Sequence, residues 1–363
     1  MKLERRDQIE AEILQWISEG VAGPPDEERF EHLAVALFEL QFRENAAFRS
    51  ISEAFGCSPG KLTSWREIPP IPTGAFKEAR LACFPAEQTR QVFLTSGSTL
   101  GARGRLELDT TELYEASLLA TLGHYLCPDA PIEFAVLAPD SAQAPDSSLS
   151  FMFDRAARRF GRGPGRFYLT PEGWSPGRVI ADLAEASDPQ LVAGTAFAFV
   201  HLIDALAERG QTLRLPAGTR VMETGGFKGR SRELEREELH RAIAQSLGVP
   251  LHRIVNQYGM CELGSQFYED SLRLGHNSNI KHVPPWVRTR AVSMETLEDV
   301  EDGEPGVLIH CDLANTGSVT TVQTSDLGRI VEGGFEILGR IEGAEARGCS
   351  IAADALLGEA RAR

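Results

Sequence analysis

Apolar residues in the first part of the chain recur at helical spacing. Ile9, Ile13 and Trp16 begin one apolar stripe, Gly-Pro-Pro at 23–25 interrupts it, and a second stripe runs from 27 to about 49. Spacings of three and four residues bring such side chains to one face of a helix. This part of the chain is therefore predicted to be a helical layer that buries its apolar stripe.

The pattern changes at about residue 91. From there to about residue 340, short runs of β-branched and apolar residues alternate with helical patterns. The runs predicted as strands are QVFLT (91–95), FAVLA (134–138), QLVAG (190–194), RVMET (220–224), RIVNQYG (253–259), GVLIH (306–310) and RIV (329–331). Such alternation predicts an α/β fold with a mainly parallel, buried sheet.

The helical patterns stop at about residue 290, where short strands separated by glycine turns take over. We therefore expect two parts. Residues 1–290 would hold the helical layer and an α/β core. Residues 291–363 would form a β-rich subdomain with a short C-terminal tail.

Composition and charge narrow the classes of function. Lys and Arg number 37 and Asp and Glu number 52, which gives a net charge of −15. An acidic surface repels phosphate backbones and anionic lipid, so we expect neither nucleic-acid binding nor membrane-surface binding. No apolar run is long enough to span a bilayer, and the N-terminus lacks the apolar core of a signal peptide. The six cysteines stand singly, without CxxC pairs, which favours a reduced, cytoplasmic protein over a disulfide or zinc framework.

The segment FLTSGSTLGARGR (93–105) carries the strongest chemical signal. A predicted strand ends at Leu94 and opens into a loop rich in glycine and hydroxyl groups. Backbone N–H groups and hydroxyls in such a loop can surround phosphate oxygens, although a Ser/Gly loop alone is also typical of a plain turn. The loop residues are Thr95, Ser96, Gly97, Ser98, Thr99 and Gly101.

Three further segments follow in order along the chain. METGGFKGR (222–230) ends a predicted strand in Gly225 and Gly226, where backbone could approach a flat ligand. NQYGMCELG (256–264) presents Tyr258, Gly259 and Glu262 just past a strand, and TSDLGR (324–329) is expected to place Asp326 on a turn between two strands, before Arg340. Each segment alone could be a turn, a helix cap or a surface carboxylate, so their order carries the information.

That order resembles the adenylate-forming superfamily of acyl-CoA synthetases, adenylation domains and luciferases. TSGST-x-G is similar to its phosphate loop, with Arg103 and Arg105 near the usual lysine position, and YGMCE is similar to its Y-G-x-T-E motif. The resemblance implies a large adenylate-forming domain in which Glu262 holds Mg²⁺, Tyr258 packs against adenine and Asp326 binds the ribose hydroxyls. Arg340 resembles the hinge arginine of the superfamily.

Only 23 residues follow Arg340, so we expect the mobile C-terminal domain of the superfamily to be absent. Together with ETGGFKGR and the tail RIEGAEARGCSIAADALL, this makes residues 50–355 resemble the LuxE family of acyl-protein synthetases. In that family a cysteine near the C-terminus receives the acyl group, which implies this role for Cys349. Arg347 nearby would favour its thiolate, although a lone cysteine is also typical of a small buried apolar residue.

The sequence thus predicts ATP-dependent activation of a carboxylic acid, expected to be a fatty acid, to acyl-AMP, and transfer to Cys349 as a thioester. ATP and Mg²⁺ are the expected cofactors, and Lys228 is assigned by its placement to assist the adenylate. An acyl reductase or another thiol-bearing protein would accept the acyl group. Two alternatives stay open, a ligase that transfers directly to CoA and a degenerate nucleotide- or acyl-binding module.

Overall fold

The computed structural model describes residues 5–95, 103–170, 173–225 and 235–341. These residues belong to two compact units, each described here by itself. Of the described residues, those within 5–121, 259–267 and 280–341 form the first unit, and those within 122–258 and 268–279 form the second. The N-terminal helices therefore share a unit with strands from the C-terminal part of the chain. The expected boundary between residues 290 and 291 remains a prediction about domains.

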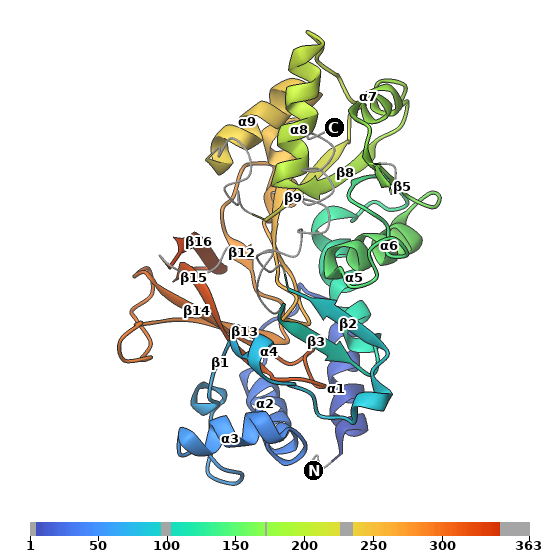
Figure 1. The fold of residues 1–363 in the computed structure, drawn as a ribbon. Coiled ribbons are helices and arrows are strands. Elements are labelled where there is room, and N and C mark those ends of the chain that lie inside the picture. The colour runs from blue at the N-terminus through green and yellow to red at the C-terminus, as the bar shows by residue number, and fades with distance from the viewer. Residues whose placement is uncertain (1–4, 96–102, 171–172, 226–234, 342–363) are drawn as a thin grey trace. The chain divides into compact units, whose positions relative to one another are not determined.

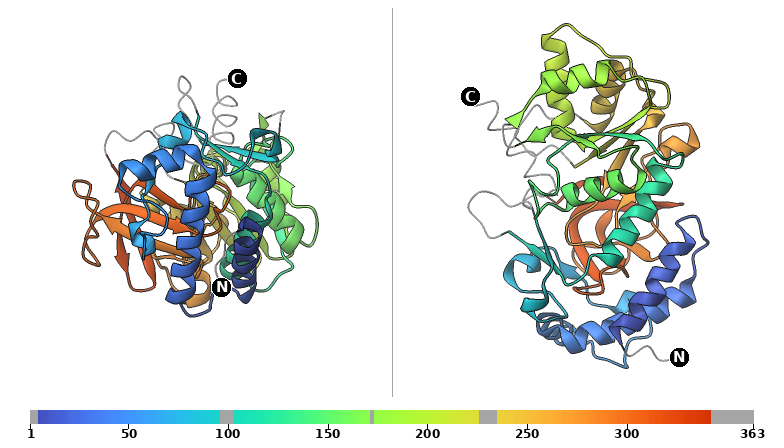
Figure 2. Two further views of the ribbon diagram at one scale, coloured as in Figure 1. Left: turned by 90° about the horizontal axis from the view of Figure 1, so that it is seen from below. Right: turned by 90° about the vertical axis from the view of Figure 1, so that its right-hand side faces the viewer.

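The first unit begins with the predicted helical layer. It consists of α1 (Arg6–Glu19), α2 (Glu27–Glu44) and α3 (Ala46–Ala54), and α1 lies beside α2 (Figures 1 and 2). The Asp26 side chain accepts a hydrogen bond from the Arg29 amide, which satisfies one of the free N–H groups at the start of α2. The predicted apolar positions, such as Ile9 and Ile13, are fully buried, so the prediction of a helical layer is confirmed.

Short elements connect the helical layer to the sheet of this unit. They are a 3₁₀ turn (Trp65–Glu67), β1 (Ile71–Pro72), α4 (Ala75–Glu78), a second 3₁₀ turn (Ala86–Gln88), β2 (Gln91–Leu94) and β3 (Arg105–Leu108). The longer helix α5 (Glu112–Leu126) follows, and its last turn belongs to the second unit. The run 91–95 was expected in a parallel sheet, and this is wrong. β2 pairs antiparallel with β3 in a separate two-stranded ribbon, because the chain returns along itself after residue 95.

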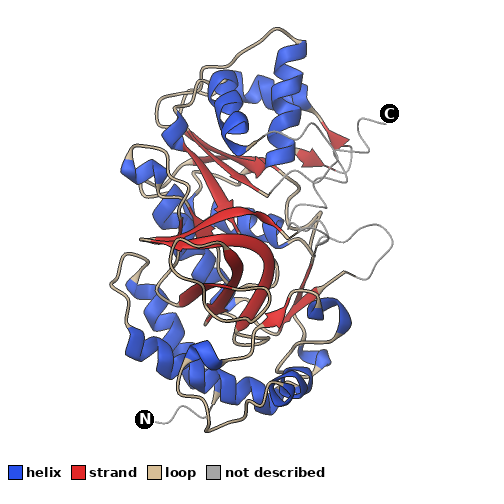
Figure 3. Cartoon of the chain, turned by 90° about the vertical axis from the view of Figure 1, so that its left-hand side faces the viewer, coloured by secondary structure: helices blue, strands red, loops and turns tan. Residues whose placement is uncertain are grey.

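An antiparallel sheet forms the core of the first unit (Figure 3). Its strands run in the order β13-β14-β15-β16-β12, and β1 pairs parallel with the start of β15. The strands are β12 (Lys281–His282), β13 (Val287–Val292), β14 (Gly306–Asp312), β15 (Thr321–Val331) and β16 (Gly334–Arg340). β14 is buried along its whole length, so the predicted β-rich character of this part of the chain is confirmed.

The expectation that Asp326 occupies a turn between two strands is wrong. Asp326 lies inside β15, which continues without interruption through the run predicted as a separate strand at 329–331. The Asp-Leu-Gly segment at 326–328 stays within the strand because a bulge between Leu327 and Gly328 shifts the register. A Cβ atom at Gly328 would lie 2.5 Å from the Glu336 carbonyl oxygen, so glycine permits the close approach of β16 rather than a turn.

The second unit holds the predicted parallel sheet, in the order β10-β9-β8-β4-β5. Its strands are β4 (Glu133–Leu137), β5 (Arg166–Phe167), β8 (Gln190–Thr195), β9 (Arg220–Thr224) and β10 (Ile254–Tyr258). The accompanying elements are α6 (Ser148–Phe160), β6 (Leu169–Thr170), β7 (Gly173–Trp174), α7 (Pro176–Ala184), α8 (Ala196–Glu208), α9 (Arg236–Leu247), a 3₁₀ turn (Leu251–Arg253) and α10 (Ser271–Leu274), while β11 (Phe267–Tyr268) lies at the division between units.

Helices α8 and α9 pack beside each other, and α8 contacts β8 and β9 (Figure 1). The Thr195 hydroxyl accepts a hydrogen bond from the Ala198 amide and so caps α8 directly after β8. α8 is the most apolar of these helices, yet none of the helices in the described residues is long and apolar enough to cross a membrane. The predicted α/β architecture is confirmed.

A buried polar network crosses the core of the first unit. Asp312, the last residue of β14, accepts hydrogen bonds from the Ser265 hydroxyl (2.8 Å) and the Ala314 amide (3.0 Å). The Ser265 hydroxyl also lies 2.9 Å from that of Ser117, and the indole N–H of Trp286 donates to both serines. Burial raises the pKa of the Asp312 carboxyl to about 6, although these hydrogen bonds oppose the shift.

We predict that Asp312→Asn makes the stability of the protein less dependent on pH. A pKa raised in the folded state means that Asp312 stabilises the fold fully below the unfolded pKa near 4, and that this contribution is lost as the pH rises through about 6. Between about pH 4.5 and about pH 7.5 the loss amounts to about 2 kcal/mol of unfolding free energy. Urea unfolding of both proteins at the two pH values measures it. An unchanged pH dependence in the variant would contradict this account of Asp312.

Candidate active site

The residues that flank the predicted phosphate loop are held together in the first unit. Thr95 follows β2 directly and makes two hydrogen bonds with Gly104, each 2.8 Å long. The Thr95 backbone amide donates to the Gly104 carbonyl, and the Thr95 hydroxyl accepts from the Gly104 backbone amide. The Thr95 carbonyl also accepts a 2.8 Å hydrogen bond from Nε of Arg103. Thr95 is buried, so these bonds fix the base of the loop. Ser96, Gly97, Ser98, Thr99 and Gly101 lie outside the described residues.

The two arginines near the loop differ in their contacts. Arg103 is anchored to the loop base through Thr95. Arg105, on β3, pairs instead with Glu107 at 3.3 Å, and its side chain is exposed. Arg103 therefore contacts the described residue at the start of the predicted loop, and which of the two arginines takes the position that the superfamily gives to lysine stays a prediction.

Glu262 is buried on the turn that follows β10 along the chain, with 3% of its surface exposed. Its carbonyl oxygen accepts a 2.9 Å hydrogen bond from the side-chain amide of Asn315, and the Leu263 backbone amide donates to the Met260 carbonyl at 3.3 Å within the same turn. The backbone that carries the Glu262 carboxylate is therefore fixed.

This carboxylate has the chemistry that Mg²⁺ requires. Mg²⁺ prefers oxygen ligands and is commonly held by one or two carboxylates together with substrate phosphates. The described residues contain no group of three or more His, Cys, Asp and Glu side chains that could hold a metal ion. A Mg²⁺ ion shared between one carboxylate and nucleotide phosphates needs no such group, so Glu262 fits the expected ion.

Asp326 and Arg340, predicted from separate motifs, lie opposite each other in the first unit. They are register partners in the β15–β16 pair, and Nε of Arg340 donates to Oδ1 of Asp326 at 2.7 Å. The Asp326 amide donates to the Thr324 hydroxyl at 3.0 Å, and the Asp326 side chain is largely buried. The carboxylate is thus held in one orientation by a charge-assisted hydrogen bond.

Gly225 and Tyr258 lie at the carboxyl ends of neighbouring strands in the second unit. β9 ends at Thr224 and β10 at Tyr258, and the parallel register pairs Thr224 with Gln257. Gly225 has φ +83°, a backbone conformation that favours glycine. Carboxyl ends of parallel strands are where open α/β sheets bind ligands. Gly226 and Lys228 lie outside the described residues, as does Cys349, while Gly259 begins the segment that returns to the first unit.

A polar cluster directly before this strand end had no signal in the sequence. The Glu223 carboxylate is 1% exposed and accepts a 2.6 Å hydrogen bond from the Asn256 side-chain amide. Nε2 of His240, from α9, lies 3.0 Å from the same carboxylate oxygen. The cluster joins β9, β10 and α9 directly before Gly225. The glutamate of METGG was visible in the sequence, but nothing there indicated that it is buried or which residues would meet it.

Comparison with known proteins identifies the relatives of this chain. The family model described as acyl-protein synthetase, LuxE, matches residues 177–357. Two curated relatives are named long-chain-fatty-acid–luciferin-component ligase. The one from Aliivibrio fischeri is 24% identical over 73% of this chain and 70% of its own length. The one from Vibrio harveyi is 22% identical over 88% of this chain and 85% of its own length.

Solved structures with the same fold are adenylate-forming ligases. A 2-hydroxyisobutyryl-CoA ligase bound to an acyl adenylate has a TM-score of 0.67 and 13% identity, over 93% of this chain and 74% of its own. ATP-bound MatB from Rhodopseudomonas palustris has a TM-score of 0.50 and 18% identity, over 71% of this chain and 49% of its own. At these identities the likeness establishes the fold, and it confirms the predicted architecture.

We predict that Gly225→Ala destabilises the protein, because alanine is strained at φ +83°. The expected loss is about 1 kcal/mol of unfolding free energy. Gly163→Ala is the matched control, since Gly163 is exposed and an added Cβ would meet no atom within 4 Å. Denaturant unfolding measures both variants, and equal stabilities would show that position 225 does not require glycine.

Proposed function

Because the chain belongs to the LuxE family of acyl-protein synthetases, we propose that it activates a fatty acid with ATP and holds the acyl group as a thioester on Cys349. The observation that carries this proposal is the family match over residues 177–357, which includes Gly225, Tyr258, Glu262 and Asp326 as well as Cys349. The fatty acid is supported by the two relatives, which are named as ligases of long-chain fatty acids.

In the first step an oxygen of the substrate carboxylate attacks the α-phosphorus of ATP. The bond from the α-phosphorus to the bridging oxygen of the β-phosphate breaks, and pyrophosphate leaves with the electron pair. Such a transfer depends mainly on positioning and on charge stabilisation. Thr95, the loop residues 96–99 and Gly101 would bind the phosphates, with Arg103 countering their charge.

The remaining residues would orient the nucleotide. Gly225, Gly226 and Tyr258 are assigned to the adenine and Asp326 to the ribose hydroxyls, with Arg340 holding the Asp326 carboxylate in place. Glu262 would hold Mg²⁺, which offsets negative charge on the phosphates when bound. Lys228 is assigned, from its placement in the sequence, to assist the adenylate.

In the second step the Cys349 thiolate attacks the carbonyl carbon of the acyl-adenylate. A C–S bond forms, the bond to the phosphate oxygen breaks, and AMP leaves. Other cysteines are poorly suited to this role. Burial raises the pKa of the thiols of Cys83, Cys127 and Cys311 to about 12, so these groups stay protonated at neutral pH.

The thioester would then pass to a second thiol, carried by an acyl reductase or another acceptor protein. A covalent acyl carrier within the enzyme divides one difficult transfer into two easier ones. Direct transfer of the acyl group to CoA is the competing outcome, and the following experiment separates the two.

We predict that Cys349→Ala retains acid-dependent ATP–pyrophosphate exchange and loses the covalent acyl adduct. Adenylate formation does not use the thiol, whereas the thioester requires it. Exchange of labelled pyrophosphate and intact-mass analysis after incubation with ATP and a long-chain fatty acid measure the two steps. Cys57→Ala is the matched control, because Cys57 is partly exposed but burial raises its pKa, so this variant should keep both activities.

An adduct that persists in Cys349→Ala would remove Cys349 from the reaction. Acyl-CoA formed by this variant from ATP, acid and CoA would identify the protein as a CoA ligase. Absence of exchange in the wild-type protein across a panel of acids would instead indicate a binding module.

We predict that Glu262→Gln raises the Mg²⁺ concentration needed for half-maximal exchange by about tenfold or more, because a neutral amide is a weaker ligand for Mg²⁺ than a carboxylate. The two side chains are nearly equal in size, so the fold should be retained. Titration of exchange with Mg²⁺ at saturating ATP measures the effect. A Mg²⁺ requirement equal to that of the wild type would assign the ion to another residue.

A further inference from the structure

We propose that Asn315 is the positioning residue for the carboxylate of Glu262. The inference rests on the proposed function, in which Glu262 holds Mg²⁺. Asn315 belongs to the loop 313–320, which joins β14 to β15 in the first unit. Neither this residue nor its loop was part of the motifs that identified the site.

The Asn315 side chain bridges two backbone carbonyls. Its Nδ2 group donates a 2.9 Å hydrogen bond to the carbonyl oxygen of Glu262 and a 3.0 Å hydrogen bond to that of Val319. Both protons of the amide are therefore used, and Asn315 is 1% exposed. A buried carbonyl deprived of its donor loses a hydrogen bond that water does not replace, so the turn at Glu262 depends on this amide.

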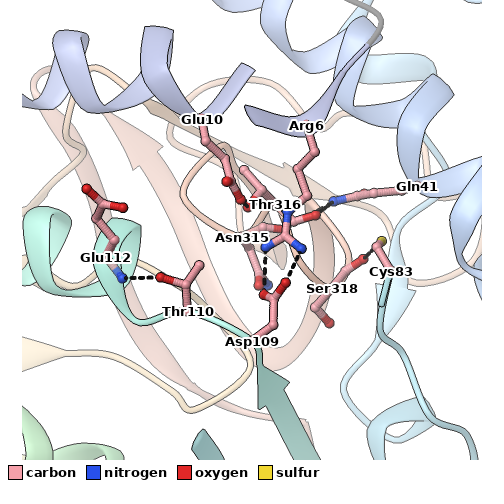
Figure 4. Close-up of polar contacts among 10 residues, drawn as sticks. All are labelled: Arg6, Glu10, Gln41, Cys83, Asp109, Thr110, Glu112, Asn315, Thr316 and Ser318. Atoms are coloured by element: carbon pink, nitrogen blue, oxygen red, sulfur yellow. Dashed lines mark hydrogen bonds and ion pairs between the residues drawn. The ribbon is translucent and has the colours of Figure 1, made fainter. Parts of the chain in front are cut away.

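The loop 313–320 is itself rigidly held by the helical layer. Gln41 of α2 donates through Nε2 to the Asn315 carbonyl at 3.1 Å (Figure 4). Its Oε1 accepts hydrogen bonds from the backbone amide and the hydroxyl of Thr320, each 2.9 Å. Gln41 is fully buried. One glutamine thus fixes both ends of the loop.

Helix α1 adds a second anchor to the same loop. The Thr316 hydroxyl donates to the Glu10 carboxylate at 2.6 Å, and Nε of Arg6 donates to the same Glu10 oxygen at 2.7 Å. Arg6 also makes two hydrogen bonds to Asp109, at 2.7 and 2.8 Å (Figure 4). Ser318 donates to the Leu81 carbonyl at 2.6 Å. With so many anchors, the Asn315 amide has little freedom to move.

The chain just after Glu262 is also held by a hydrogen bond to the end of β14. Ser265 donates to Asp312, the residue that immediately precedes the loop. The turn is therefore held at residue 262 by Asn315 and at residue 265 by Asp312. Groups that orient a metal ligand without touching the metal affect metal affinity, by about 10–100-fold when they are removed. From this loop, the Asn315 side chain donates to the Glu262 carbonyl.

The experiment titrates ATP–pyrophosphate exchange with Mg²⁺ in the full chain, for wild type, Asn315→Ala and Asn315→Ser. We expect the Mg²⁺ concentration at half-maximal exchange to rise about tenfold in both variants, with a smaller change in the rate at saturating Mg²⁺. Ser318→Ala serves as the structural control, because it removes a buried hydrogen bond from the same loop without touching Glu262. Asn277→Ala controls for loss of an exposed asparagine.

Thermal melting is recorded for every variant. The Asn315 variant that keeps the higher melting temperature is the one whose Mg²⁺ requirement is compared with that of the wild type. A wild-type Mg²⁺ requirement in a folded Asn315 variant would overturn the inference. An equal rise in Ser318→Ala would also overturn it, because the effect would then come from loosening of the loop as a whole. Absence of exchange in the wild type would instead contradict the proposed function, and a Mg²⁺ requirement unchanged by Glu262→Gln would contradict the role of Glu262.

Discussion

A buried loop needs hydrogen-bond partners for most of its polar groups, and this constraint shapes the first unit. The loop 313–320 is almost fully buried, although Asn315, Thr316, Ser318 and Thr320 are polar. Buried N–H and C=O groups without partners are costly, so helices, strands and neighbouring turns must all be arranged to meet them. Gln41 alone satisfies groups at both ends of the loop. The N-terminal helical layer is thus part of what keeps the loop 313–320 in place.

The same constraint explains the buried carboxylates. Asp312 accepts hydrogen bonds from Ser265 and from the Ala314 amide, and Glu223 lies within hydrogen-bonding distance of Asn256 and His240. Glu223 lies just before Gly225 along the chain, and Asp312 accepts a hydrogen bond from Ser265, which follows the turn that carries Glu262. Buried charges of this kind are expensive unless they are well bonded, and their partners consequently fix the backbone around them. Rigid strand ends with polar supports are what an enzyme of this superfamily requires, because its chemistry depends on position.

Many of the helices and strands could be predicted from the sequence, because the patterns that indicate them are local. Apolar spacing identified α1 and α2, and β-branched runs identified β8, β9 and β10, whose ends carry Gly225 and Tyr258. Contacts that depend on register or on long-range packing could not be predicted. Asp326 was placed on a turn because Asp and Gly favour turns, whereas its pairing with Arg340 of β16 keeps it within β15. Asn315 carries no local signal at all, since its importance arises from a partner 53 residues away in sequence.

The pairing of Asp326 with Arg340 limits how this hairpin can evolve. The two residues are register partners, and the side chains of a strand alternate between the two faces of a sheet. Insertion of a single residue within either strand would turn one partner to the opposite face and separate the pair, unless a further bulge compensated. Homologues that keep this ion pair should therefore conserve the spacing between the two positions even where the intervening side chains diverge. Length variation in this region would then be confined to the Glu332–Gly333 turn, where an added loop leaves the pairing intact.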